Sequence, residues 1–138
     1  MLRQVGKYMN HKISDFIIRI KNAALARRKD ISLPYSKVNK EIGKVLAKIG
    51  YLENVKDAEE NGKKVIKATV KYEKRLPVIT GVDIISKPSL RVYGSIREIT
   101  NVERRGRKTT IVSTSQGVMI GKEAIKKKIG GEILFAIW

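Results

Sequence analysis

The chain has 138 residues, a length that suits one compact domain or two small domains that share an interface. Its 30 Lys and Arg residues outnumber its 13 Asp and Glu residues, and the resulting net charge of +17, spread over both halves, indicates a polyanionic partner. The chain has no Cys and a single His, which excludes a disulfide framework and a thiolate metal site, and no cofactor is expected.

The first predicted elements are an N-terminal extension, a helix and a short strand. Residues 1–10 are expected to form a loosely ordered extension. Apolar residues then recur at helical spacing from about Lys12 to Arg27, and Asn10 is a candidate N-cap because its side chain can accept from free amides of the first turn. The strand that follows is expected to end at Pro34.

A second helix and a β-hairpin complete the first domain. Ser36 is a good N-cap for the helix, and Gly50 is its expected C′ residue. Lysines three and four residues apart form a basic stripe that faces either a phosphate backbone or water: Lys37, Lys40, Lys44 and Lys48. Strands over about 51–57 and 63–72 are joined by the strong hairpin signal Asn61-Gly62. Irregular alternation in the second of these strands allows a bulge.

The second half of the chain predicts a β-rich domain with short helices. The charged, Pro-containing segment 73–81 marks the boundary, so the expected domains are residues 11–75 and 76–138. The predicted strands cover about 82–86, 90–96, 109–113 and 132–138, the predicted helical segments 99–103 and 122–128, and a basic loop 104–108. The fold class is therefore α+β, with an N-terminal α-β-α-β-β domain and a β-rich C-terminal domain.

The sharpest local feature is the run Ser113-Thr114-Ser115-Gln116-Gly117. Hydroxyl groups both donate and accept, and a glycine lets the backbone approach a partner, which suits phosphates, 2′-hydroxyls and base edges. On composition alone, a polar turn after a strand is the favoured interpretation. Basic residues on both sides of the run are candidates for phosphate contacts: Arg107, Lys108, Lys126 and Lys127. Tyr93 is either a stacking residue or a partly buried sheet residue.

No constellation typical of an enzyme is present in the sequence. The segment from Gly117 to Lys122 lacks the glycine spacing of a phosphate-binding loop, and Glu123 stands where that motif needs Ser or Thr. Any Ser-His triad would depend on His11, near the N-terminal extension. We therefore expect neither catalytic nor metal-binding residues. No apolar stretch approaches the roughly 20 residues of a membrane span and no secretory signal is visible, so an intracellular protein without membrane contact is expected.

Six short segments occur in an order that is specific when they are taken together. They are Asp15 with Arg-Ile-Lys-Asn-Ala at 19–23, Ile-Ile-Ser-Lys-Pro at 84–88, Leu-Arg-Val-Tyr at 90–93, Ser-Thr-Ser-Gln-Gly-Val at 113–118, Lys-Glu-Ala at 122–124 and Gly-Gly-Glu-Ile at 130–133. Together they resemble the family of the bacterial-type small ribosomal subunit protein eight, also called the universal S-eight family, from about residue 11 to residue 138.

The resemblance implies a non-enzymatic, two-domain structural protein that binds the central domain of small-subunit ribosomal RNA early in assembly. It also implies a monomer within a cytoplasmic or organellar ribosome, beside neighbouring small-subunit proteins, with the C-terminal domain making the main RNA contact. By the same resemblance, Ser113, Thr114, Ser115 and Gly117 approach the RNA with Glu132 nearby, and Lys87, Pro88 and Tyr93 border that surface.

Four features depart from the family pattern. They are the extension at residues 1–10, His11-Lys12 where the family often has Asp-Pro, Ser89 in place of a usual Gly, and the unusually basic loop 104–108. The exchange at Ser89 brings the turn geometry there into question. The alternative function is that of a nonspecific DNA-binding architectural protein, which would bind any duplex of equal charge.

Overall fold

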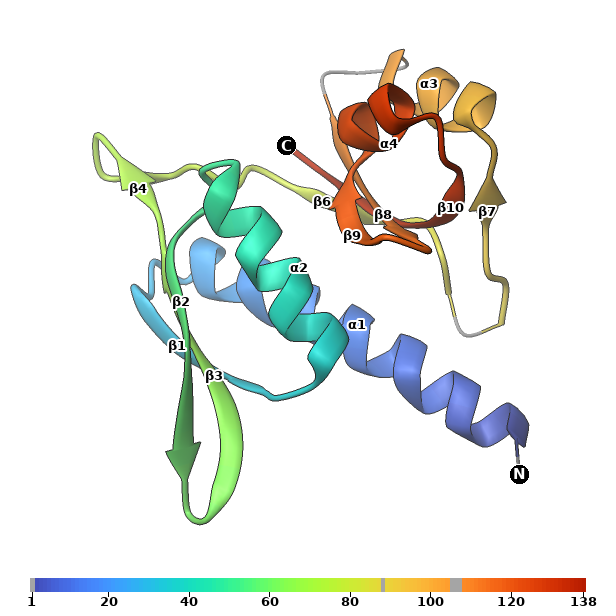
Figure 1. Cartoon of the computed structure of the whole chain (residues 1–138). Helices are drawn as coiled ribbons and strands as arrows, with labels where there is room; N and C mark the ends of the chain where they lie inside the picture. The colour runs from blue at the N-terminus through green and yellow to red at the C-terminus, as the bar shows by residue number, and fades with distance from the viewer. Residues whose placement is uncertain (1, 88, 105–107) are drawn as a thin grey trace. The chain divides into compact units, whose positions relative to one another are not determined.

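The structure is a computed structural model that describes residues 2–87, 89–104 and 108–138, with side chains for 13–87, 89–103 and 108–138. The chain divides into two compact units. We call residues 12–80 the N-terminal unit. We call residues 81–138 the C-terminal unit, and the residues before 12 group with it. Helices and antiparallel sheets occur in both units, which confirms the predicted α+β class (Figure 1).

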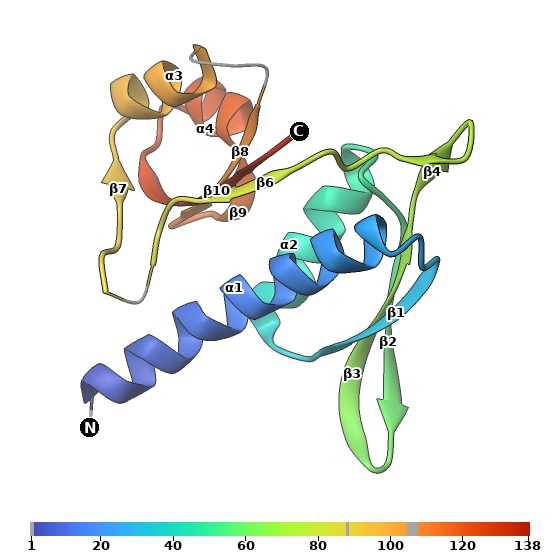
Figure 2. The same ribbon diagram turned by 180° about the vertical axis from the view of Figure 1, so that it is seen from behind.

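The N-terminal unit is a three-stranded antiparallel sheet with two helices on one face (Figures 1 and 2). Its elements are α1 (Leu2–Leu25), of which residues from Lys12 onward belong to this unit, β1 (Asp30–Pro34), α2 (Lys37–Lys48), β2 (Leu52–Glu60), β3 (Lys63–Val70), β4 (Tyr72–Glu73) and β5 (Leu76–Pro77). The order of the sheet is β1-β3-β2, and β4 and β5 form a small separate hairpin.

The core of this unit lies between the helices and the sheet. Gly43 of α2 faces Val55 of β2 and Phe16 of α1, so the absent side chain lets the three elements approach one another closely. The largest fully buried residues here come from both helices and all three strands: Phe16, Ile17, Ile20, Leu33, Ile42, Leu46, Leu52 and Ile66. This packing explains why the helical apolar pattern was readable from the sequence.

Both ends of α2 follow the predicted capping chemistry. The Ser36 side-chain oxygen accepts from the Asn39 amide at 3.0 Å. At the other end Gly50 has φ +93°, and the Tyr51 amide donates to the Leu46 carbonyl oxygen at 2.9 Å. This left-handed ending satisfies carbonyl groups that the helix leaves free. The predicted cap and C′ residue are confirmed.

Three expectations for the N-terminal half are wrong. Helix α1 begins at Leu2, so Asn10 lies inside the helix and does not cap it. No proline interrupts residues 2–12, and the sequence continues the apolar helical spacing there. The helix ends at Leu25 because Arg27 adopts a left-handed φ of 58°. The irregular register lies in β2, between Leu52 and Asn54, and not in the strand that follows.

The C-terminal unit is a five-stranded antiparallel sheet with two helices on one face (Figures 1 and 2). Its elements are β6 (Val82–Ile84), β7 (Tyr93–Gly94), α3 (Ile96–Arg104), β8 (Thr109–Thr114), β9 (Gly117–Ile120), α4 (Gly121–Lys127) and β10 (Gly131–Ile137). The order is β6-β10-β8-β9, and β7 also pairs with β10. Strand β10 is therefore the centre of this sheet.

Local interactions explain where this unit differs from the sequence expectation. The predicted strand over 90–96 is reduced to β7, because the Ser95 amide donates to the Glu98 carboxylate at 3.3 Å as α3 begins. Strand β9, which was not predicted, pairs with β8 across the turn at Ser115 and Gln116. Buried residues from the sheet and both helices form the core: Ile99, Val112, Met119, Ala124 and Ile133.

Candidate nucleic-acid interface

The turn between β8 and β9 presents the hydroxyl-rich run. The Thr114 hydroxyl donates to the Gly117 carbonyl oxygen at 2.8 Å and accepts from the Gln116 amide at 3.1 Å. Gly117 has φ +110°, which a residue with a side chain rarely adopts. Ser115 and Gln116 are exposed at the tip. Thr114 and Gly117 therefore shape the turn, and Ser115 is free to present its hydroxyl group to a partner.

Three candidate residues lie in one row across the sheet. Ser113 of β8 is opposite Glu132 of β10, and Glu132 is opposite Tyr93 of β7. Their neighbours Val112 and Ile133 belong to the core beneath the helices, and successive side chains of a strand point to opposite faces. The row therefore lies on the face of the sheet that α3 and α4 leave open.

Glu132 and Tyr93 differ in their exposure within this row. Glu132 is half-buried, and its Oε2 atom is buried without a hydrogen-bond partner among the described residues. An oxygen in this state loses its hydration without compensation, so an arriving donor would be bound favourably. Tyr93 is 63% exposed, so its ring is available for stacking and is not the partly buried sheet residue of the second interpretation.

A tight turn borders the row at Lys87. The Lys87 amide donates to the Leu90 carbonyl oxygen at 2.9 Å, and the Leu90 amide returns a bond to Lys87 at 3.0 Å. Lys87 is exposed, and Leu90 is 68% exposed. The candidate Pro88 lies outside the described residues.

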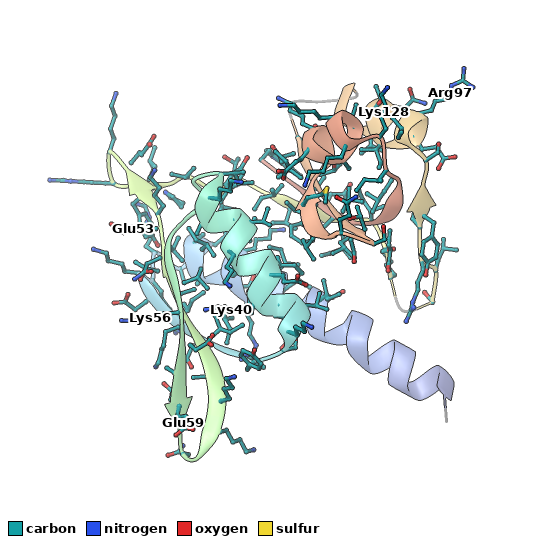
Figure 3. All side chains as sticks on the ribbon, viewed as in Figure 1. Lys40, Glu53, Lys56, Glu59, Arg97 and Lys128 are labelled. Atoms are coloured by element: carbon teal, nitrogen blue, oxygen red, sulfur yellow. The ribbon has the colours of Figure 1, made fainter. Side chains whose placement is uncertain are left out.

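The basic candidate residues differ in how free their side chains are to contact a phosphate. Lys126 and Lys127 are exposed on α4, near Lys128, which ends the helix with a left-handed φ of 59° (Figure 3). Lys108 is partly engaged, because its ammonium group lies 4.4 Å from the centroid of the Trp138 ring. Arg107 lies outside the described residues. The α4 lysines are therefore the freest of the predicted phosphate contacts.

The basic stripe on α2 is not uniform. Lys40 pairs with Asp57 of β2 at 2.9 Å, and its side chain is only 15% exposed. Its hydrogen bond is the main reason why the pKa of Asp57 lies below its ordinary range. The other three members are exposed: Lys37, Lys44 and Lys48. Within the stripe, Lys40 thus joins α2 to the sheet of the N-terminal unit and is not available to a partner.

Sequence reasoning missed two exposed residues at this surface. Gln116 stands at the tip of the β8–β9 turn beside Ser115, and its position inside the run could have identified it. Leu90 is an exposed apolar residue next to Lys87, and no polar signal marks it.

Within the described residues there is no group of three or more His, Asp or Glu side chains that could hold a metal ion. No helix of the described chain is both long and apolar enough to cross a membrane.

Comparisons with known proteins identify the family of the chain. The family model described as ribosomal protein S8 matches residues 11–138. Small ribosomal subunit protein uS8 of Nitratidesulfovibrio vulgaris is 45% identical over 126 residues, which cover 91% of this chain and 96% of the relative. The protein of the same name from Staphylococcus saprophyticus is 42% identical over 131 residues, 94% of this chain and 98% of the relative.

A further relative is small ribosomal subunit protein uS8c of Physcomitrium patens. It is 41% identical over 131 residues, which cover 94% of this chain and 98% of the relative. The family model thus spans residues 11–138, and the relatives cover more than nine-tenths of the chain. The chain belongs to the ribosomal protein S8 family, whose members are structural, non-enzymatic constituents of the small ribosomal subunit.

Proposed function

We propose that this protein binds directly to the central domain of small-subunit ribosomal RNA through its C-terminal unit, early in assembly. The observation that carries the proposal is the Ser113–Glu132–Tyr93 row, which combines a hydroxyl, a carboxylate oxygen that lacks a donor among the described residues and an exposed aromatic ring on the sheet face opposite α3 and α4. Single-stranded or looped RNA offers matching groups in its 2′-hydroxyls, amino groups and base faces.

Each candidate has a distinct role in this contact. The Ser115 hydroxyl, at the exposed tip of the turn, donates to or accepts from a base or sugar edge. Glu132 accepts from an RNA hydroxyl or amino group, and Tyr93 stacks on an unpaired base. Ser113 adds a second hydroxyl beside Glu132, while Thr114 and Gly117 hold the turn in shape.

Basic residues of the C-terminal unit position the RNA and do not read its sequence. Lys126 and Lys127 are exposed and have no ion pair among the described residues. Together with Lys87, they would neutralise backbone phosphates. Each neutralised duplex phosphate adds roughly 0.9 to the slope of log affinity against log salt concentration. Affinity should therefore fall steeply with salt, and a flat response would contradict the proposal.

The decisive experiment compares Ser115→Ala with Lys126→Ala. Ser115 is exposed, so its truncation should leave the melting temperature almost unchanged while costing about 1–3 kcal/mol of affinity for cognate RNA. Lys126→Ala should weaken all RNAs alike and lower the salt slope by about 1. Cognate and scrambled RNA are titrated with both variants.

The controls separate the competing interpretations. If Ser115→Ala lowers stability but keeps the preference for cognate RNA, the turn is structural and recognition lies elsewhere. Central-domain fragments of small-subunit ribosomal RNA are titrated with duplex DNA of equal charge as competitor. Equal affinity for the two would identify a nonspecific DNA-binding protein, whereas preference for one RNA fragment supports the proposed site and its place in assembly.

A further inference from the structure

Two hairpin turns of the N-terminal unit share a backbone conformation but have opposite chemistry. Asn61-Gly62 joins β2 to β3 with φ of 54° and 76°. Lys74-Arg75 joins β4 to β5 with φ of 51° and 68°. Left-handed φ at both central residues defines a turn that favours Asn-Gly, because most side chains are strained there. The second turn therefore holds two long basic side chains in an unfavourable conformation.

The Lys74-Arg75 turn is fixed against the segment that follows α1. The Arg27 guanidinium donates to the Arg75 carbonyl oxygen at 3.0 Å, and the Tyr72 hydroxyl donates to the Arg28 carbonyl oxygen at 2.6 Å. The Val70 amide donates to the Lys29 carbonyl oxygen at 2.8 Å. These three bonds join residues 27–29 to residues 70–75, so the basic side chains of both segments stand on one rigid support.

These segments together form a surface that we call the basic corner. It consists of five exposed residues: Arg27, Arg28, Lys29, Lys74 and Arg75. None of the five has an ion pair among the described residues, whereas Arg19, Lys40 and Lys67 elsewhere in the unit are paired with carboxylates. The basic corner thus concentrates five positive charges that make no ion pair within the described unit, and they outnumber the two neighbouring carboxylates, Asp30 and Glu73.

We propose that the basic corner binds the phosphate backbone of RNA, as a contact separate from the Ser115 turn. The choice of RNA as the ligand of the basic corner rests on the proposed function. Guanidinium groups match phosphate oxygens in pairs, and strained backbone is retained mainly where the strained residues have a function. Backbone phosphates carry no sequence information, so this contact positions RNA and does not read its sequence.

The first test changes the turn to the sequence that its backbone favours. Lys74→Asn with Arg75→Gly should raise Tm by roughly 4–8 °C, because the strain is relieved. The same variant should lower RNA affinity and reduce the salt slope by about 1 for each phosphate that the corner no longer neutralises. A more stable protein that binds RNA less tightly is the expected result. Unchanged affinity and slope would overturn the proposal.

A charge-matched control separates a local contact from the general effect of net charge. Adding Glu59→Lys to Lys74→Asn/Arg75→Gly restores the two positive charges near the other turn, because Glu59 lies one residue before the end of β2. Figures 1 and 2 show the two hairpins at opposite ends of the unit, and Figure 3 labels Glu59. Affinity should stay low in the triple variant. Full recovery would mean that only net charge matters, and would overturn the basic corner as a site.

The second test locates RNA directly, since the chain has no cysteine. Leu76, which is 58% exposed beside the turn, and Gln116, exposed at the β8–β9 turn, are each changed to Cys and labelled with an iron chelate that cleaves nearby RNA. Both labels should cleave small-subunit ribosomal RNA, at different nucleotides. Cleavage from Gln116→Cys alone would overturn the basic corner and leave the proposed function standing. Cleavage from neither would overturn both, and crosslinking of Leu76→Cys to a protein alone would identify a protein contact instead.

Discussion

In each unit the sheet face opposite the helices carries similar polar residues, but the hydrogen-bonding groups of these residues are satisfied differently in the two units. In the N-terminal unit the Glu60 carboxylate accepts from the Ser32 hydroxyl at 2.9 Å and pairs with Lys67. In the C-terminal unit Glu132 lies opposite Ser113 and keeps one buried oxygen without a donor among the described residues. A satisfied carboxylate needs no partner molecule, while one that is buried without a donor gains stability from binding. Hydrogen-bond satisfaction, and not composition, therefore distinguishes the two surfaces.

The largest expected difference between the two units is in the stability lost when a glycine is replaced by alanine at a close contact between elements. A Cβ atom at Gly131 would collide with the carbonyl oxygen of Ser113, which is backbone and cannot move aside. Gly131→Ala should therefore destabilise the C-terminal unit by about 3 kcal/mol or more. In the N-terminal unit, a Cβ at Gly43 would lie 3.1 Å from a methyl group of Val55. Gly43→Ala also gains helix propensity, so its net effect should stay within about 1 kcal/mol.

Chemical denaturation of both glycine variants, followed by circular dichroism and by amide NMR signals of each unit, checks this expectation. Loss of C-terminal signals in Gly131→Ala, with the N-terminal signals retained, is the expected pattern. Wild-type stability of Gly131→Ala would mean that β8 and β10 can separate at low cost. The predicted contrast, in which the C-terminal sheet loses more stability from an added methyl group than the packing of α2 does, would then be wrong.

The second expected difference is in the effect of the Glu132 and Glu60 carboxylates on RNA affinity. Glu132→Gln replaces a half-buried carboxylate that has one buried oxygen without a donor among the described residues, so stability should be unchanged or slightly higher, while RNA affinity should fall by about 1–3 kcal/mol. Glu60→Gln removes an exposed ion pair, so it should change stability little and leave RNA affinity unaffected. Titration calorimetry with cognate RNA gives both affinities. A loss of affinity in Glu60→Gln that equals the loss in Glu132→Gln would remove the distinction between the faces.

The smallest expected effect is the acid sensitivity of the N-terminal sheet. A hydrogen bond from Lys40 lowers the pKa of Asp57, and one from Lys67, supported by Ser32, lowers the pKa of Glu60. The unfolded chain therefore binds more protons, so this stabilisation is present above the unfolded pKa and is lost as pH falls through the folded pKa. Stability should decrease below about pH 4.5, the ordinary value for Glu60. In Asp57→Asn/Glu60→Gln the decrease should be shallower, as followed by Tm against pH, and an identical profile would contradict it.

Elements with local signals could be predicted from the sequence. Helix α2 was predictable because Ser36, Gly50 and the apolar spacing act within a few residues. The Asn61-Gly62 hairpin was predictable for the same reason. The turn that contains Ser115 was also predictable as a polar turn after a strand, and its role in RNA binding stays a prediction. Local chemistry thus accounts for most of the element types.

Features that depend on pairing between distant segments could not be predicted. The Ser113–Glu132–Tyr93 row exists only because β10 lies between β8 and β7, a register that no local pattern specifies. The unsatisfied oxygen of Glu132 follows from the same register. The Lys74-Arg75 turn contradicts the usual residue preference, so the sequence offered no sign of a tight hairpin there.

The central position of β10 determines when the C-terminal unit can fold during synthesis. Its neighbours β6, β7 and β8 all precede it in the chain, so they are translated before the strand that joins them exists. The strands of the N-terminal sheet are complete once Val70 has left the exit tunnel, so that sheet can form while translation continues. The surface proposed to bind RNA is thus assembled last. A nascent chain that stalls before Gly131 would lack the strand that pairs with β6 and β8, and their unpaired edges could then pair with another chain.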